Sequence, residues 1–154
     1  MLESSGERTL HDVEHDWQGG VTQSRWTAHG SGAVVLVEDH PELATYLAER
    51  LSEYAQVSVF SNAEAALDHI GTHGCAVLIS DIGLAGMSGI ELCRRIKADQ
   101  RLSATPVILV SALSVDANRQ AARAAGATAF LGKPFSLEAL LEKMDQACSR
   151  EQPG

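Results

Sequence analysis

Apolar and polar positions follow two alternating patterns from Ala33 onward. Short, continuous apolar runs are typical of strands that are buried on both faces of a sheet. Stretches in which apolar residues recur every three or four positions are typical of helices with one buried side. The runs predict five strands, at residues 33–37, 57–60, 75–80, 106–111 and 127–132. The periodic stretches predict five helices, at residues 41–54, 62–71, 88–99, 116–125 and 137–148.

Residues at the predicted helix ends support these assignments. Pro41 suits the first turn of a helix, because a backbone N–H has no intrahelical acceptor there. Ser61 and Glu64 have the S-x-x-E spacing of a capping box, and Ser136 is a good N-cap for the last helix. Gly126 ends the alanine-rich fourth helix. Each strand is therefore followed by a helix after a short connection.

Five strand-helix pairs in this order define an α/β fold. They predict one five-stranded parallel sheet, doubly wound, with right-handed crossovers and helices on both faces. The chain has 154 residues, which suits a single domain of this kind, and we assign the domain to residues 33–148. Residues 1–32 are polar and rich in Gly, Ser, Thr and His, so we expect a flexible tail or linker there. We expect residues 149–154 to form a short C-terminal tail.

Composition narrows the classes of partner. The chain has 12 Lys and Arg against 20 Asp and Glu, and its net charge of -8 disfavours direct binding to nucleic acid. Cys75, Cys93 and Cys148 have no metal-binding spacing and are odd in number, as expected in a reducing compartment. No window approaches the ~20 apolar residues of a membrane span, and the N-terminus lacks the apolar stretch of a signal peptide. We therefore expect a cytoplasmic protein that binds neither DNA nor membrane.

Ionisable and hydroxyl side chains follow the predicted strands at the point where each strand ends. Glu38 and Asp39 follow the first strand, Asp81 the third, Ser111 ends the fourth, and Lys133 follows the fifth. The carboxyl ends of parallel strands meet at one edge of a sheet, where ligands bind. Three carboxylates gathered there repel one another unless a cation is supplied, and Mg²⁺ suits such oxygen ligands. Lys133 adds a positive charge suited to phosphate.

Four segments together resemble the receiver domain of two-component response regulators. They are "VVLVEDH", "ISDIGLAGMSGIEL", "PVILVSA" and "GATAFLGKPF", in the family's order and at fitting separations. The resemblance covers about residues 33–148 and implies a flavodoxin-like (βα)5 fold. It also implies that Asp81 accepts a phosphoryl group from a phosphohistidine on a sensor histidine kinase or a histidine phosphotransfer protein.

The resemblance assigns the metal ligands. Glu38, Asp39 and Asp81 would hold Mg²⁺, with Asp39 the more direct ligand of the first two. The backbone carbonyl of Gly83 would complete the protein's share of the ligands. A receiver domain would assist only its own phosphorylation and dephosphorylation. The resemblance therefore implies a signalling protein and not an enzyme.

The resemblance also implies a conformational switch. Ser111 and Lys133 would bind phosphoryl oxygens, and the ring of Phe130 would rotate inward as Ser111 moves. The altered surface would lie on the fourth helix, the fifth strand and the fifth helix. It would regulate a downstream target protein that the sequence does not identify, and homodimers of such domains commonly form there.

Several positions depart from the family's pattern. Ala85 stands where proline is usual, so we expect a less rigid loop after Asp81. Gly83 and Leu113 offer no polar side chain to orient the water that hydrolyses the acyl phosphate, so we hypothesise slow self-dephosphorylation. The Lys133-Pro134 bond is a candidate cis peptide.

Other interpretations remain beside this one. A phosphohydrolase with an aspartyl nucleophile would need a second carboxylate at position 83, where the chain has glycine. The glycines at 83, 86 and 89 have the wrong spacing for a dinucleotide-binding loop. A receiver used as an unphosphorylated interaction module, and a receiver segment of a hybrid histidine kinase, are the two alternatives that the sequence leaves open.

Overall fold

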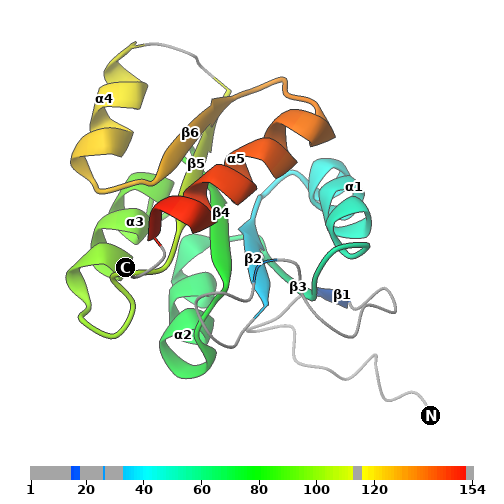
Figure 1. Cartoon of the computed structure of the whole chain (residues 1–154), viewed down its shortest axis with the longest axis horizontal. Coiled ribbons are helices and arrows are strands. Elements are labelled where there is room, and N and C mark those ends of the chain that lie inside the picture. Colours follow the sequence, from blue (N-terminus) through cyan, green and yellow to red (C-terminus); the bar gives the residue numbers. More distant parts are fainter. Residues whose placement is uncertain (1–14, 18–25, 27–32, 113–115, 152–154) are drawn as a thin grey trace.

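The computed structural model describes residues 15–17, 26, 33–112 and 116–151. Within them, five parallel strands alternate with five helices, as the sequence predicted (Figure 1). The parallel strands are β2 (Val34–Val37), β3 (Val57–Phe60), β4 (Val77–Asp81), β5 (Val107–Ser111) and β6 (Ala129–Gly132). The helices are α1 (Pro41–Leu51), α2 (Ala63–His73), α3 (Gly89–Ala98), α4 (Asp116–Ala124) and α5 (Leu137–Glu151).

The strand order is that of a doubly wound sheet, which confirms the predicted fold class. The order is β1-β3-β2-β4-β5-β6, and every pair from β3 to β6 is parallel. The chain leaves β2 toward β3 on one side and returns to form β4 on the other. The carboxyl ends of β2 and β4 therefore flank the point where the winding reverses, the usual ligand position in such sheets.

A sixth strand was not predicted. β1 (His15–Trp17) pairs antiparallel with β3, from His15 opposite Val59 to Trp17 opposite Val57. It comes from the segment predicted as a tail and covers the outer edge of β3, where unpaired backbone groups would otherwise be exposed. Apart from this strand and Trp26, residues 1–32 lie outside the described residues.

Two apolar layers enclose the sheet. Successive strand residues point to opposite faces, so Val34 and Leu36 join one buried cluster while Val35 and Val37 join the other. The first cluster is completed by α1 and α5, and the second by α2, α3 and α4. All three cysteines are buried. In the part of the chain that the structure describes, no helix has the length and apolar character needed to cross a membrane.

The predicted capping box of the second helix is wrong. The N-cap of α2 is Asn62, whose side-chain oxygen accepts a hydrogen bond from the N–H of Ala65 at 2.8 Å. Asn62 takes an extended backbone conformation and is as good a cap as the neighbouring Ser61. Glu64 is not part of a box, because its carboxylate accepts a bond from the N–H of Met87. At the last helix, the predicted cap Ser136 accepts a bond from Ala139 at 3.0 Å.

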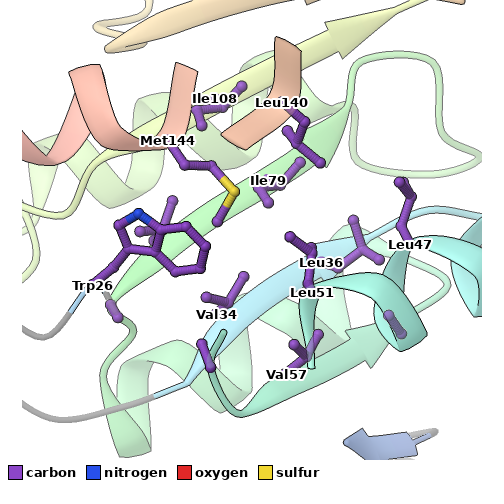
Figure 2. Close-up of a cluster of buried hydrophobic side chains, with 14 of the residues drawn as sticks. Trp26, Val34, Leu36, Leu47, Leu51, Val57, Ile79, Ile108, Leu140 and Met144 are labelled. Atoms are coloured by element: carbon purple, nitrogen blue, oxygen red, sulfur yellow. The ribbon is translucent and has the colours of Figure 1, made fainter. Parts of the chain in front are cut away.

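Trp26 extends the first cluster beyond the predicted domain boundary. Its side chain is 2% exposed, and Figure 2 shows the indole beside Val34 and Met144. The indole Nε1 donates a hydrogen bond to Asp145 Oδ1 on α5 at 2.8 Å, so the ring's polar atom is satisfied. The ring centroid lies 6.3 Å from that of Tyr54. Trp26 thus connects the N-terminal segment to α5 and to the turn that follows α1.

We expect Trp26→Ala to lower the free energy of unfolding by about 3–5 kcal/mol, because a large buried ring is removed and a cavity remains. Tyr46, 52% exposed on α1, provides the control. Tyr46→Ala should change the same quantity by about 0.5 kcal/mol or less. Urea unfolding followed by circular dichroism measures both. Equal effects of the two substitutions would contradict the role assigned to Trp26.

Candidate functional site

Three carboxylates meet where β2 and β4 end. Val37 lies opposite Ser80 in the parallel register, so Glu38 and Asp39 leave β2 beside Asp81, the last residue of β4. Each of the three acidic residues offers an oxygen within 4.8 Å of the others. Glu38 is 5% exposed and Asp81 9%, whereas Asp39 faces solvent. The predicted cluster is thus assembled, and all of its side-chain donors are oxygens.

Lys133 brings a cation to this cluster from β6. Its backbone N–H bonds to the carbonyl of Ser111 at 2.8 Å, which anchors it at the edge of the sheet. The ammonium Nζ lies 3.0 Å from Glu38 Oε1 and 3.5 Å from Asp81 Oδ2. The Lys133-Pro134 peptide is cis, as the sequence suggested. The side chain therefore reaches across β5 and contacts both buried carboxylates.

Burial and charge compete in this cluster. Burial raises the pKa of Asp81, the negative charge of Glu38 raises it further, and the ammonium of Lys133 only partly offsets them. Burial is also the largest single influence on Lys133 and acts to lower its pKa. The hydrogen bond and charge of Glu38, together with Asp81, outweigh it, so the pKa of Lys133 is raised. The lysine is thus held as a cation, while an ionised Asp81 favours additional positive charge nearby.

Ser111, the predicted hydroxyl, is 4% exposed at the end of β5. Val110, the residue before it, lies opposite Asp81. The Oγ of Ser111 accepts a hydrogen bond from Nδ2 of Asn118 at 3.0 Å. Asn118 was not predicted, because an amide in the first turns of a helix is usually solvated. The amide fixes the Ser111 hydroxyl beside the carboxylates and connects it to α4.

Phe130, the predicted switch aromatic, is 9% exposed and packs in the second apolar cluster. The guanidinium carbon of Arg119 lies 4.9 Å from the centre of its ring, within the range of a cation-π contact. Arg119 follows Asn118 directly in α4. Two adjacent residues of one helix therefore contact Ser111 and Phe130, the two residues predicted to move together.

The loop after Asp81 is tied to α2. Glu64 accepts a hydrogen bond from the N–H of Met87 at 2.9 Å, and this bond lowers the pKa of Glu64. Gly86 has a φ of +76°, and a Cβ there would lie 2.7 Å from Glu64 Oε2. The positive φ therefore favours glycine here, whereas the exposed Glu64 side chain could shift to make room for a Cβ. The S-x-x-E spacing had predicted a capping role for Glu64, and this contact was not predicted.

Gly83 and Leu113 are the two positions predicted to govern hydrolysis of the acyl phosphate. Gly83 is exposed in the loop, and a Cβ placed there would meet no atom within 4 Å. The metal contact predicted for its carbonyl stays a prediction. Leu113 lies outside the described residues.

Comparison with known proteins identifies the family. The family model for the response regulator receiver domain matches residues 34–145. The response regulator ArlR of Staphylococcus aureus is 32% identical over 121 residues, which cover 78% of this chain and 53% of that protein. A receiver domain of a signal transduction histidine kinase from Syntrophus aciditrophicus is 30% identical, with a TM-score of 0.70 over 78% of this chain and 92% of that one. The chemotaxis response regulator CheY4 of Vibrio cholerae is 26% identical, with a TM-score of 0.69 over 76% and 99%.

The chain belongs to the response regulator receiver family, a family of signalling domains. It spans about half the length of the curated relatives that it matches. Family membership covers the whole carboxylate cluster, since Glu38 to Lys133 fall within the matched residues.

Gly89 allows α3 to approach the end of β4. A Cβ there would lie closer to the carbonyl oxygen of Asp81 than real Cβ contacts do. We expect Gly89→Ala to lower the free energy of unfolding by about 1–3 kcal/mol, because the helix and the strand end must separate. Gly71, inside α2 with open space around its Cα, is the control. Gly71→Ala should raise stability by about 0.5–1 kcal/mol in thermal or urea unfolding. A neutral Gly89→Ala would show that the close approach is not required.

Proposed function

We propose that this protein is the phosphoacceptor of a two-component or phosphorelay system. A sensor histidine kinase or a histidine phosphotransfer protein would donate the phosphoryl group, and Asp81 would accept it. The observation that carries the proposal is the cluster of Glu38, Asp39 and Asp81 with the Lys133 ammonium 3.0 and 3.5 Å from two of them. This cluster lies at the carboxyl edge of the sheet, in a family that signals through such domains.

The geometry supports the following transfer step. A carboxylate oxygen of Asp81 attacks the phosphorus, the bond from phosphorus to the histidine nitrogen breaks, and that nitrogen takes up the electron pair. The product is an acyl phosphate on Asp81. Phosphoryl transfer asks the protein mainly for an in-line nucleophile and positive charge at the phosphoryl oxygens. Lys133 and the hydroxyl of Ser111 would contact these oxygens.

The donor set fits a divalent cation. Glu38, Asp39, Asp81 and the carbonyl of Gly83 offer oxygens only, the ligand type that Mg²⁺ takes in proteins. When bound, Mg²⁺ supplies positive charge beside the phosphoryl oxygens. The raised pKa of Asp81 supports such a partner, because Lys133 alone does not offset the burial of this carboxylate and the charge of Glu38.

The proposed response to phosphorylation runs through Ser111 and Phe130. A phosphoryl oxygen would draw the Ser111 hydroxyl toward Asp81 and change its bond to Asn118. The Phe130 ring and Arg119 would adjust with α4, and the surface of α4, β6 and α5 would change. A target protein that reads this surface is the proposed output. The protein would act in the cytoplasm, either free-standing or as the receiver segment of a longer protein such as a hybrid kinase.

Asp81→Asn should abolish phosphorylation. The amide cannot act as the nucleophile, so incorporation from a small phosphodonor or a cognate phosphohistidine protein should fall to background. Asp68→Asn, at an exposed aspartate on α2, is the control and should leave incorporation unchanged. Removing Mg²⁺ with EDTA should stop incorporation in both wild type and control. Incorporation that persists in Asp81→Asn would locate the acceptor elsewhere.

We expect the acyl phosphate to decay over minutes or longer rather than seconds, because Gly83 presents no side chain to the attacking water. Gly83→Asn should accelerate the decay by about tenfold, because an amide there can orient the water and the position has room for it. Radiolabel decay after removal of the donor measures the lifetime. Gly71→Asn, at a glycine that also has open space but lies on α2, is the control. Decay of the wild type within seconds would refute the hypothesis.

A further inference from the structure

A basic pocket lies on the surface made by α4, β6 and α5. Arg119 and Arg123 of α4 and Lys143 of α5 line it, and it has a volume of about 270 Å³. The other lining residues are Ala122, Ala127, Thr128, Ala129, Phe130 and Gln146. The pocket therefore combines three cations with an apolar floor and two polar side chains.

Most arginines on the other described helices form an ion pair with a carboxylate of the same helix or of the turn after it. Arg50 pairs with Glu53 on α1, and Arg94 and Arg95 both pair with Glu91 on α3. Among the described residues, no carboxylate forms an ion pair with Arg119, Arg123 or Lys143. A chain with a net charge of -8 thus gathers three cations in one pocket with no ion-paired carboxylate in the described part of the chain. Like charges at close range repel, so an anionic group that enters the pocket would relieve the repulsion among the three cations.

We propose that this pocket binds a carboxylate-rich segment of a partner protein. An acidic peptide matches both features of the lining, because its carboxylates can meet the cations and its aliphatic side chains can cover Ala127 and Ala129, which are partly exposed. The net charge of -8 opposes the approach of nucleic acid. A two-fold dimer centred on the pocket would place its cations against the same cations of the second copy. The observations therefore favour an acidic partner over both.

The pocket is also connected to the phosphorylation site. Arg119 lines the pocket and covers the ring of Phe130, while the preceding residue, Asn118, donates to Ser111 Oγ. A movement of Ser111 toward a phosphoryl group would thus act on the helix that supplies two of the three cations. This regulatory part rests on the proposed function, whereas the binding of an acidic segment by the pocket does not.

Fluorescence anisotropy with the full chain tests the binding. The probe is a short labelled peptide in which Glu and Asp alternate with Leu and Ala, and its control replaces each acid by the amide. Titration without a phosphodonor should show saturable binding of the acidic peptide, weakening with added salt, and at least tenfold weaker binding of the amide peptide. The double substitution Arg123→Glu with Lys143→Glu should weaken binding by at least about tenfold, because two attractive contacts become repulsive.

The control reverses a single charge elsewhere on the molecule. Arg50→Glu, on α1, should change the affinity by about twofold or less, because exposed charges at a distance are screened by salt. Equal losses for Arg50→Glu and the pocket variant would overturn the proposal. So would equal binding of the amide peptide, tighter binding of a DNA duplex, or a dimer in sedimentation that the pocket substitutions dissociate.

Acyl phosphate formation on the wild type is measured separately. Phosphorylation without peptide binding would overturn the pocket proposal alone. Peptide binding without phosphorylation would support the pocket and overturn the proposed function. Tighter peptide binding after phosphorylation would support the connection through Asn118 and Arg119, since coupling between two sites is reciprocal.

Discussion

The repulsion among three carboxylates at one edge of the sheet is the constraint on which the rest of the structure depends. Glu38 and Asp81 are nearly buried, so water screens their charges poorly. The fold relieves part of this cost with one ammonium, that of Lys133, delivered from two strands away. Only a sheet in which β2 adjoins β4, with β6 two strands beyond β4, brings these groups together. The continuous apolar strands and the two layers of helices hold that arrangement against its own electrostatics.

The groups around this edge are fixed by contacts that differ in kind. Lys133 is held by charge, Ser111 by a neutral hydrogen bond from Asn118, and the loop after Asp81 by the bond from Met87 to Glu64. The bond from Met87 to Glu64 restrains the loop that was expected to be less rigid because Ala85 replaces proline. A carboxylate on α2 now restrains the segment that a proline would otherwise stiffen. Because Glu64 is exposed, this restraint is weaker than a buried bond and leaves the loop able to adjust.

The carboxylate cluster could be predicted from the sequence because a parallel sheet places all its strand ends at one edge. Knowing which residue ended each strand was enough to bring Glu38, Asp81 and Lys133 together. Trp26 and Asp145 are 119 residues apart, and nothing local marks them as partners. Glu64 and Met87 are 23 apart, and the local capping pattern favoured a different role. Contacts set by the sheet topology could therefore be predicted from the sequence, whereas contacts set by the packing of one particular side chain could not.

Strand β6 links the two charged regions of the molecule. It contains Phe130 and leads directly to Lys133, so the aromatic ring under Arg119 and the cation beside Asp81 share one short, rigid element. Helix α4 makes a second link through Asn118 and Arg119. A new charge at Asp81 would act on Lys133 and Ser111 at once, and both lead to the same surface. Two independent connections to one pocket favour a concerted response of that surface over separate movements of single side chains.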